Sequence, residues 1–596
     1  MSNRTTARVL ILATWFGLVT GLLEGTGLLV AQKLRWLDWE TLQRGVALEI
    51  VWIAPLVDLV LFGVVGVILV LAAWIFSRLE ITRISVFVFA FMAFADLVAL
   101  TGRIQLYSVV IFAAGLATAF VRWFYKHEDA AWRFQRQRLA RVVAAAMLAL
   151  VGIEGGGWLF ERIAIVRSPT AASGTPNILL IVIDTLRADH LSSYGYGRQT
   201  TPNIDRLANQ GVLFERAFSA SSWTAPSHAT ILTGRLPSEH QVEWNKDLDG
   251  RYPVIPELLR RQGYRTAAFT GNSDWFSRRV GFGRGFIHFE DYFYSVPDMV
   301  VRTVYGRTLS KLWIFRRLGL STGMFVEKER RRASLINRSA LRWIQRDAET
   351  PFFVFLNYYD VHAPYAPRDS HRERFSKVVE NGGRASIDDY DGEIAYVDDY
   401  VGQLLRELEA FRLAQPLLVI VTSDHGESFG EHGFYLHANS LFLNEVHVPL
   451  IFWWRGAIPA GVRIEAPVAN AAVPATVMDL VGNRDGSVFP GSSLARTWRG
   501  DRAVDDRGDL LAEIAQQPFV PEKVPVSHGW MKSILTAEWH YMEHEKFGGQ
   551  LYAWRSDPGE QNDLAKRPDL QDVVNRFRSQ LRHDSRDEAS NAISRR

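Results

Sequence analysis

Hydrophobic positions are unevenly distributed along this chain. Long apolar runs fill the first 165 or so residues, and the rest has the mixed pattern of a soluble globular protein. Five runs approach or exceed the roughly 20 residues with which a helix crosses a bilayer core. They fall at Val9–Ala31, Val46–Phe76, Ile84–Leu100, Ile104–Val121 and Val142–Phe160. We predict five transmembrane helices, or four, because the third and fourth runs are near the lower length limit.

The distribution of Lys and Arg around these runs predicts their orientation. With a cytoplasmic N-terminus, the inner segments hold more basic residues than the outer ones, chiefly in the segment from Arg122 to Arg141. That bias is typical of cytoplasmic loops. Five spans then place everything after Phe160 outside the cytoplasm, and four spans reverse this. We expect a multi-pass protein of the cell (inner or plasma) membrane with its C-terminal part extracytoplasmic.

Four acidic residues lie inside or at the edges of the apolar runs. They are Glu24, Asp58, Asp96 and Glu154. Because a charge is costly to bury in lipid, intramembrane acids are often functional. Such residues also line polar seams between helices or lie near the headgroups. The sequence is compatible with both interpretations.

After a short linker, strands and helices alternate. The segment Ser168–Pro176 is rich in Ser, Thr, Pro, Gly and Ala, as linkers are. Runs of branched apolar residues then predict buried strands. These strands are expected at Asn177–Asp184, Thr266–Phe269, Phe352–Leu356, Leu417–Thr422 and Val448–Phe452. With helical patterns between them, they predict an α/β fold with a mainly parallel sheet sandwiched by helices.

Polar residues follow several of these strands. Asp184 ends the first, Asn357 and His362 follow the third, and Asp424 and His425 follow the fourth. In open α/β sheets, ligands bind off the carboxyl ends of the strands. Two acids and two histidines from distant parts of the chain are therefore expected to converge at one edge of the sheet. Packing of the core alone does not explain such a group of polar residues.

Composition excludes some classes of function. The 596 residues include 67 basic and 64 acidic ones, a net charge of +3. This near-balance gives no reason to propose nucleic acid as a partner. The chain has no cysteine, which excludes disulfides, thiolate metal sites and a thiol nucleophile.

Five sequence blocks occur in a particular order in the C-terminal part. They are Ile183–Asp189 with Thr201–Asp205; Ser222–Ala229 with Leu232–Gly234; His362–Tyr365; Ser423–Glu427 with Gly430–Gly433; and Leu551–Tyr552 with Ser556–Glu560 and Asp563–Leu564. Together they resemble the sulfatase family of the alkaline-phosphatase superfamily. The resemblance covers residues 177–564, most of the chain after the apolar runs.

The resemblance implies an α/β domain of the alkaline-phosphatase and sulfatase type, with a small C-terminal α+β subdomain. The expected organisation has five parts. They are a transmembrane helical region at 1–165, a linker at 166–176, a sulfatase-like catalytic domain at 177–500, a C-terminal subdomain at 501–580 and a disordered tail at 581–596.

The resemblance also implies a divalent metal at the strand ends. Asp184, Asp424 and His425 match protein ligands, and Thr224 matches the metal-bound nucleophile. Two carboxylates and an imidazole suit zinc or manganese better than calcium, which prefers an all-oxygen cage. A metal beside a hydroxyl makes an alkoxide available near neutral pH.

Three histidines complete the candidate site. His362 and His437 are expected to stabilise the non-bridging oxygens or to protonate the leaving group, which makes them both catalytic and substrate-binding. His228 is a further candidate for binding substrate. His432 is a candidate of the same rank as His228, whereas surface or turn roles account for Arg187 and Asn357.

The chain also departs from the family pattern. Sulfatases carry Cys or Ser, converted to formylglycine, where this chain has Thr224. The usual Arg is His228, the usual second acid is Thr185 and the usual late Lys is His437. A Thr nucleophile resembles the branch that transfers phospho-groups to envelope lipids, such as phosphoethanolamine transferases. The C-terminal block is more similar to ordinary sulfatases.

We therefore expect a membrane-anchored, metal-dependent hydrolase or transferase. Its partners would be the lipid bilayer and phosphate or sulfate esters of envelope lipids or glycans, attacked by Thr224. One alternative is a sulfuric ester hydrolase, like an arylsulfatase, that works without formylglycine. Another is a non-catalytic membrane receptor or scaffold, which the retained Asp184, Thr224, Asp424 and His425 argue against.

A basic stretch interrupts the soluble part. Residues 300–346 are rich in Arg and Lys and include Trp313, Ile314 and Phe315. Such a segment is typical of a lid or of a surface that lies on anionic lipid. A solvated helix before the strand at Phe352 is the alternative.

Overall fold

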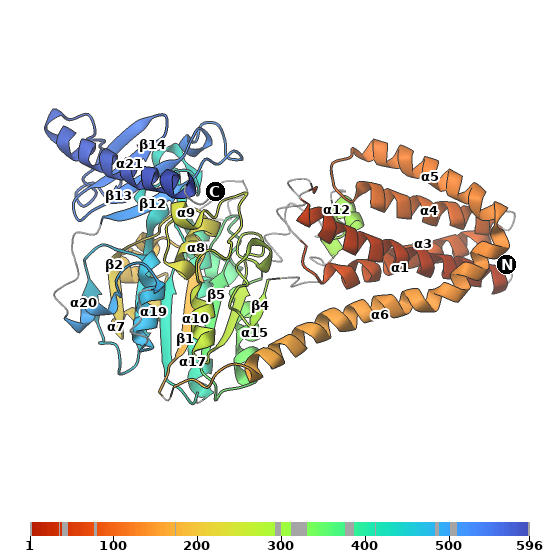
Figure 1. The fold of residues 1–596 in the computed structure, drawn as a ribbon, viewed down its shortest axis with the longest axis horizontal. Coiled ribbons are helices and arrows are strands. Elements are labelled where there is room, and N and C mark those ends of the chain that lie inside the picture. Colours follow the sequence, from red (N-terminus) through yellow and green to blue (C-terminus); the bar gives the residue numbers. More distant parts are fainter. Residues whose placement is uncertain are drawn as a thin grey trace. The chain divides into compact units, whose positions relative to one another are not determined.

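The computed structural model of the chain consists of two compact units (Figure 1). The membrane-helix unit comprises Met1–Ala164 and Tyr292–Glu329, and the sheet unit comprises Ile165–Asp291 and Arg330–Arg596. The structure describes residues 3–34, 36–37, 46–76, 80–172, 174–291, 300–310, 331–375, 387–411, 413–482, 488–500 and 509–593.

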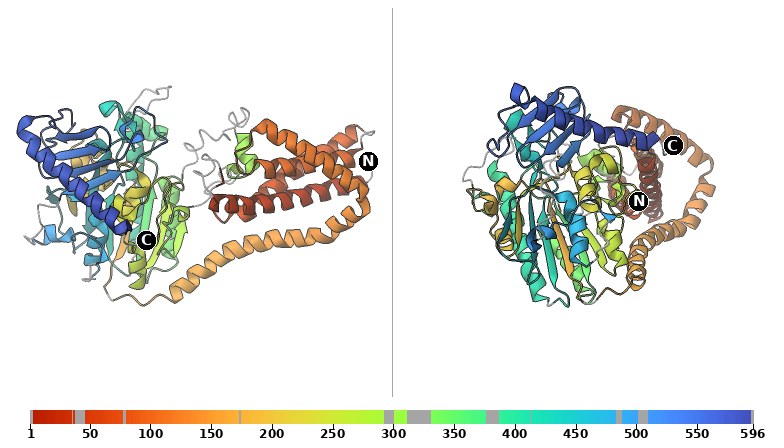
Figure 2. Two further views of the ribbon diagram at one scale, coloured as in Figure 1. Left: turned by 45° about the horizontal axis from the view of Figure 1, so that its top comes forward. Right: turned by 60° about the vertical axis from the view of Figure 1, so that its left-hand side comes forward.

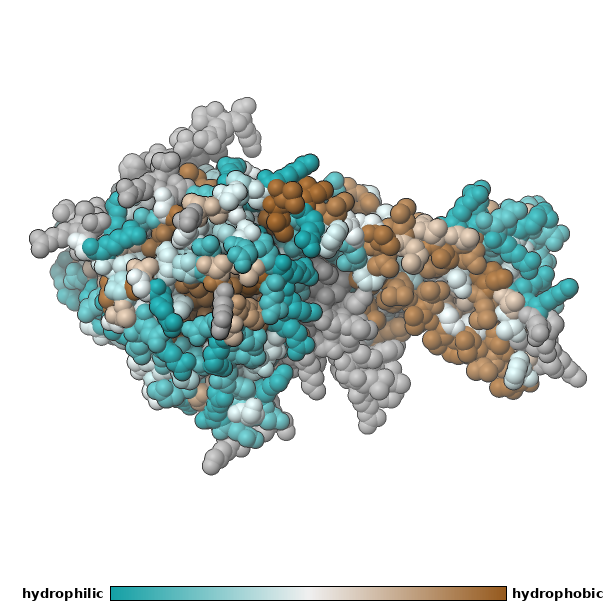
Figure 3. All heavy atoms as spheres, turned by 90° about the horizontal axis from the view of Figure 1, so that it is seen from below, coloured by the Kyte–Doolittle hydropathy of each residue, from teal (hydrophilic) through white to brown (hydrophobic). Residues whose placement is uncertain are grey.

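Five long helices build the membrane-helix unit, and each is long and apolar enough to cross a membrane. They are α1 (Asn3–Lys33), α3 (Ile50–Ile75), α4 (Ile81–Ala99), α5 (Leu106–Lys126) and α6 (Glu128–Val166). Apolar side chains cover much of their surface (Figure 3). Five helices rather than four therefore match the apolar runs. The segment from Arg122 to Arg141, predicted as a loop, is helical on both sides of His127, because Ala, Arg and Gln favour helix.

Helices α1 and α3 pack with their backbones in close approach. Gly17, Gly21 and Gly25 form one stripe along α1. A Cβ atom added to Gly21 would lie 2.3 Å from the Pro55 Cα, and one added to Gly25 would lie 2.6 Å from the Ile50 carbonyl oxygen. Small residues at this spacing are typical of membrane helix pairs. The sequence analysis did not identify this stripe.

Part of the basic stretch belongs to the membrane-helix unit. The chain leaves the sheet unit after Asp291 and returns at Arg330, and the intervening α12 (Val304–Ser310) packs on α4. The Tyr305 hydroxyl donates to the Met92 carbonyl at 2.6 Å. Within the range expected as a catalytic domain at 177–500, the described residues 300–310 thus group with the membrane helices. Trp313, Ile314 and Phe315 lie outside the described residues.

The sheet unit is built around a nine-stranded sheet with strand order β10-β2-β9-β6-β1-β5-β3-β4, and β11 pairs with β2. The strands are β1 (Asn177–Ile183), β2 (Val212–Phe218), β3 (Arg265–Thr270), β4 (His288–Glu290), β5 (Phe352–Tyr358), β6 (Leu417–Thr422), β9 (His447–Trp454), β10 (Val462–Ile464) and β11 (Val468–Ala469). All five predicted strands are present. The last of them, β9, runs antiparallel to β6 and β2, which the apolar pattern did not reveal.

Helices cover both faces of this sheet (Figure 2). Alternate β1 side chains point to opposite faces, Leu180 to one core and Leu179 to the other. The first core is closed by α8 (Thr224–Thr233), α10 (Ile255–Arg261) and α19 (Val473–Leu480). The second is closed by α7 (Pro202–Asn209), α15 (Ala333–Gln345) and α17 (Ile387–Ala410). Shorter elements are α9 (Pro237–His240), α16 (Asp369–Arg372), β7 (Ser428–Phe429), β8 (Tyr435–Leu436), α18 (Leu443–Val446) and α20 (Ala495–Arg499).

A smaller α+β part follows. Four antiparallel strands, β12 (Leu510–Ile514), β13 (Met531–Leu535), β14 (His540–His544) and β15 (Gly548–Tyr552), pack against α21 (Gln571–Ile593). The mixed sheet between helices, followed by this part, agrees with the predicted fold class. The tail expected to be disordered from residue 581 is instead helical as far as Ile593.

Candidate active site

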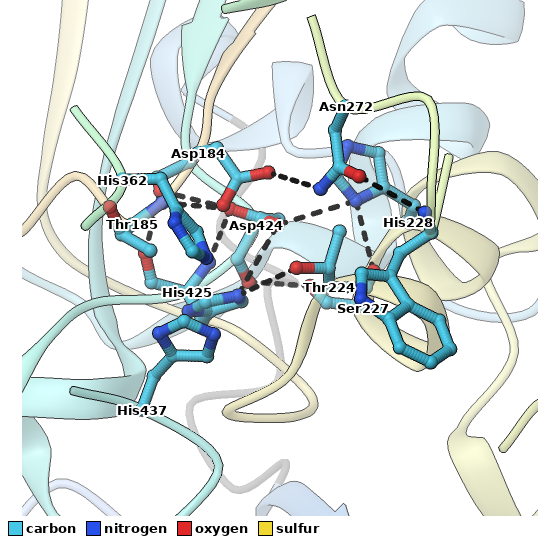
Figure 4. Close-up of polar contacts among 12 residues, drawn as sticks. Asp184, Thr185, Thr224, Ser227, His228, Asn272, His362, Asp424, His425 and His437 are labelled. Carbon is cyan, nitrogen blue, oxygen red and sulfur yellow. Dashed lines mark hydrogen bonds and ion pairs between the residues drawn. The ribbon is translucent and has the colours of Figure 1, made fainter. Parts of the chain in front are cut away.

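The candidate site is assembled from the carboxyl ends of adjacent strands. Strands β1 and β6 are parallel neighbours, so Asp184 and Asp424, which follow them, lie side by side (Figure 4). Both carboxylates are fully buried. Ligand atoms of Asp184, Asp424 and His425 all lie within 4.8 Å of one another. These three residues, from distant parts of the chain, therefore lie together at the strand ends.

Each buried carboxylate keeps one oxygen without a hydrogen bond. Asn272 donates to Asp184 Oδ2 at 3.0 Å, and the backbone amides of Thr185 and His425 donate to Asp424 Oδ1 at 3.2 and 3.0 Å. Asp184 Oδ1 and Asp424 Oδ2 have no hydrogen-bond partner among the described residues. Burial raises the pKa of each carboxyl to about 7. The charge of His437 opposes this rise but does not cancel it.

His425 is oriented by its own loop. Its Nδ1 lies 2.9 Å from the Gly426 carbonyl oxygen, to which it can donate. That hydrogen bond leaves the Nε2 lone pair directed toward Thr224 and the carboxylates (Figure 4). A backbone carbonyl on the far ring nitrogen is the usual support of a metal-binding histidine. Burial lowers the pKa of His425 to about 4, which keeps the ring neutral.

Thr224 occupies the first position of α8. Its Oγ1 lies 3.2 Å from His425 Nε2, and its side chain is almost fully buried. One turn later Ser227 donates to the Asp424 carbonyl oxygen at 2.5 Å, which attaches α8 to the end of β6. The free N–H groups at a helix start favour an anion near Thr224.

These residues fit a divalent ion. Two buried carboxylate oxygens without hydrogen bonds lie close to an imidazole nitrogen whose other neighbour is the Thr224 hydroxyl. Burying such a set with no cation is costly. A metal-ligand role for Asp184, Asp424 and His425 therefore agrees with the chemistry of the donor set.

His228 lies beneath the site. It is fully buried, and its ring packs 4.5 Å from Phe276 between centroids. Its Nδ1 lies 2.9 Å from the Thr224 carbonyl oxygen, and Asn357 Nδ2 lies 3.3 Å from its Nε2. Burial lowers its pKa to about 3. Both ring nitrogens are thus engaged by the protein, an arrangement that supports the first turn of α8 and does not suit the predicted contact with substrate.

His362 and His437 lie together next to His425. The His437 ring centroid is 4.5 Å from that of His425 and 4.8 Å from that of His362. His437 Nδ1 lies 2.9 Å from Glu427 Oε1. Burial lowers the pKa of His437, but the Glu427 carboxylate outweighs it and raises the pKa to about 9. The structure thus groups both predicted histidines near the carboxylates.

Sequence reasoning missed three supporting residues. Asn272 follows β3 and bonds to Asp184, so the rule applied to the other strand ends would have found it. Thr185 adopts a positive φ of 58°, which directs its amide to Asp424, and such strain in a β-branched residue is typical of functional sites. Glu427 was noted only as part of a motif, but it is the partner of His437.

Other candidates have structural roles. Arg187 is nearly buried and forms ion pairs with Asp189 at 2.7 Å and Glu431 at 2.6 Å. Asn357 accepts from Thr270 at 2.8 Å. His432 stacks on Phe442 with 3.6 Å between ring centroids. These contacts give each of the three residues a structural role.

Known proteins share this architecture. The sequence model of the family described as Sulfatase matches residues 176–483, just over half of the chain. The chain belongs to the sulfatase family. Among its relatives, a choline-sulfatase of Rhizobium meliloti (strain 1021) is 25% identical over 458 residues, 66% of this chain and 83% of the relative. An N-acetylgalactosamine-6-sulfatase of Canis lupus familiaris is 28% identical over 384 residues, 57% of this chain and 70% of the relative.

A solved structure shows the same fold. The phosphonate monoester hydrolase of Agrobacterium radiobacter superposes with a TM-score of 0.54 at 19% identity, covering 69% of this chain and 96% of that one. Family membership makes this chain a sulfatase-like enzyme that acts on esters. The family generally binds a divalent metal, as the donor set here also favours.

Proposed function

We propose that this protein is a membrane-anchored, metal-dependent hydrolase or transferase of phosphate esters, with Thr224 as its nucleophile. The supporting observation is the Thr224 hydroxyl, 3.2 Å from His425 Nε2, beside two buried carboxylates with unpaired oxygens. Asp184, Asp424 and His425 would hold a zinc or manganese ion, whose charge favours the alkoxide form of Thr224.

In the proposed reaction the Thr224 oxygen forms a bond to phosphorus as the bond to the leaving alcohol breaks. The leaving oxygen takes a proton from His437 or His362, which lie together beside the carboxylates. A water molecule or an acceptor hydroxyl then attacks phosphorus, gives its proton to the same histidine and releases Thr224.

A threonine nucleophile favours phosphate esters over sulfate esters as substrates. The family relatives are named as sulfatases, but the chain has no cysteine from which a formylglycine could be made. A threonine oxygen that attacks phosphorus forms an ester that water or an acceptor can cleave. Sulfate-ester hydrolysis at the same site is the second candidate, and the relatives favour it.

The substrate would carry an apolar or ring-shaped group. Trp223, directly before Thr224, packs 4.8 Å from Trp275 and 6.0 Å from Phe519 between ring centroids. Trp275 and Trp244 are partly exposed, and Phe519 is 41% exposed. Aromatic faces next to a reaction centre suit sugar rings or lipid headgroups. With the five apolar helices, this supports esters of envelope lipids or glycans, with catalysis outside the cytoplasm.

The purified full-length protein, assayed in detergent with p-nitrophenyl sulfate, p-nitrophenyl phosphate and bis-p-nitrophenyl phosphate, tests the proposal. We expect turnover of a phosphate ester above that of the sulfate ester. Mass spectrometry of protein quenched during turnover should find the mass of the transferred group on the peptide that contains Thr224. A faster reaction with the sulfate ester would favour the second candidate. An adduct on another residue would refute the proposed nucleophile.

A further inference from the structure

Three buried carboxylates meet inside the membrane-helix unit. Glu24 lies on α1, Asp58 on α3 and Asp96 on α4, and all three side chains are fully buried. Each offers an oxygen within 4.8 Å of the others. The glycine stripe explains their proximity, because the close approach of α1 and α3 leaves little between Glu24 and Asp58.

These carboxylates lack the partners that burial requires. Glu24 Oε1 accepts from the Val304 amide at 2.6 Å. Glu24 Oε2 and all four oxygens of Asp58 and Asp96 have no hydrogen-bond partner among the described residues. An unpaired polar oxygen in such an environment costs several kcal/mol. Asp58 and Asp96 in particular are fully buried, and none of their oxygens accepts a hydrogen bond from the described residues.

The positive charge near the cluster comes from Arg307. Arg307, on α12, is close enough to interact electrostatically with Glu24 and Asp96, while its guanidinium donates to the Leu100 carbonyl at 3.2 Å. With all three carboxylates ionised, this guanidinium would leave two of their negative charges to be balanced. One divalent cation would make the group neutral.

The absence of hydrogen bonds between the three groups favours a bound ion over a shared proton. Carboxyl groups that share a proton have their oxygens about 2.5–2.7 Å apart, and no hydrogen bond joins these three groups. Two oxygens bound to one calcium ion at about 2.3–2.6 Å lie up to about 5 Å apart. All-oxygen donors select hard cations such as calcium or magnesium.

We propose that Glu24, Asp58 and Asp96 form a second metal site, which binds a hard divalent cation such as Ca²⁺ inside the membrane-helix unit. Because Glu24 also accepts from Val304, the cation would fix α12 on the membrane helices. The donor set differs from that of the candidate active site, which includes an imidazole. The inference does not depend on the proposed catalytic activity.

Calcium binding to the full-length protein tests this proposal. The protein in detergent is stripped with a chelator and dialysed against ⁴⁵Ca²⁺, both as wild type and as the double variant Asp184→Asn/Asp424→Asn. We expect the double variant to retain one saturable Ca²⁺ per chain. In that background, Asp58→Asn or Asp96→Asn should weaken binding at least tenfold. Glu154→Gln serves as the matched control, because this exposed acid of α6 bonds to Trp52 and lies outside the cluster.

The outcomes are distinct. If the active-site double variant does not bind Ca²⁺, the proposal is overturned, whatever the cluster variants do. That result would leave the proposed function unaffected. Unchanged affinity in a folded Asp58→Asn variant, or an equal loss in Glu154→Gln, would also overturn it. Size-exclusion chromatography and near-UV circular dichroism establish that each variant is folded.

Discussion

The Thr224 hydroxyl oxygen lies 3.2 Å from His425 Nε2, although 201 positions separate the two residues in the chain. Hydrogen bonds outside this contact hold both residues in place. Thr224 begins α8, which Ser227 attaches to the Asp424 carbonyl, and His425 is held by the Gly426 carbonyl. The oxygen of the proposed nucleophile and the candidate metal ligands are thus preorganised, which favours catalysis.

Removal of the Thr224 hydroxyl should abolish turnover while leaving the fold intact. We expect Thr224→Ala to lower kcat by roughly a thousandfold or more, because the covalent step is lost. Thr224→Ser keeps an oxygen and should retain measurable activity. Steady-state kinetics on the best ester substrate measures both. Thr497→Ala, on α20 and bonded only locally to Leu494 among its recorded contacts, is the control. Comparable activity of Thr224→Ala and wild type would contradict the mechanism.

Loss of a carboxylate should empty the active-site metal position. Asp424→Asn replaces an ionised oxygen with a neutral amide at a position where the donors are buried. We expect zinc or manganese content, measured by plasma mass spectrometry, to fall by about one ion per chain, and thermal stability to drop because bound metal stabilises the folded state. Asp569→Asn, an exposed acid, should change neither value. Unaltered metal content in Asp424→Asn would remove this residue from the ligand set.

Asn272 should tune metal affinity without binding metal itself. Its amide donates to Asp184 Oδ2 and leaves Oδ1 free. We expect Asn272→Ala to weaken metal binding by about 10- to 100-fold, the usual effect of losing a residue that orients a ligand. Competition against a chelator of known affinity measures this. Asn562→Ala, at an exposed loop position, should bind like wild type. A similar loss there would indicate a global effect.

Glu290 and Arg331 join the two points where residues 292–329 leave and re-enter the sheet unit. Arg331 donates to the Glu290 carbonyl at 2.9 Å and also pairs with its carboxylate. Burial raises the pKa of Glu290, but the His288 hydrogen bond and the Arg331 charge outweigh it and lower the pKa to about 2. Its stabilising contribution is therefore complete above its ordinary value of 4.5 and is lost as the pH falls through about 2.

We expect Glu290→Gln to lower the free energy of unfolding at neutral pH. The difference from wild type should shrink as the pH falls from about 4.5 to about 2, because the wild-type carboxylate is then protonated as well. Denaturant unfolding followed by tryptophan fluorescence at several pH values measures this. Glu538→Gln, at an exposed site, should give no such dependence. A constant difference across this range would show that the ion pair does not stabilise the fold.

Much of the sheet unit was predictable from local patterns. Buried strands such as Asn177–Ile183 are runs of branched apolar residues, and polar residues directly after them mark the edge where ligands bind. Asp184, Asp424 and His425 were found in this way. Asn272 obeys the same rule and was overlooked. The direction of β9 could not be read, because a central antiparallel strand buried on both faces has the same apolar sequence as a parallel one.

The sequence by itself determined the five apolar helices, the α/β class, the family motifs and the residue types of the metal-ligand set, because each depends on neighbours in the chain. Only the tertiary structure decided that the described residues 300–310 belong with the membrane helices, that His228 of α8 contacts Asn357, and that Glu24, Asp58 and Asp96 meet. These relations join residues tens to hundreds of positions apart. They depend on packing between helices and strands, which no local pattern specifies.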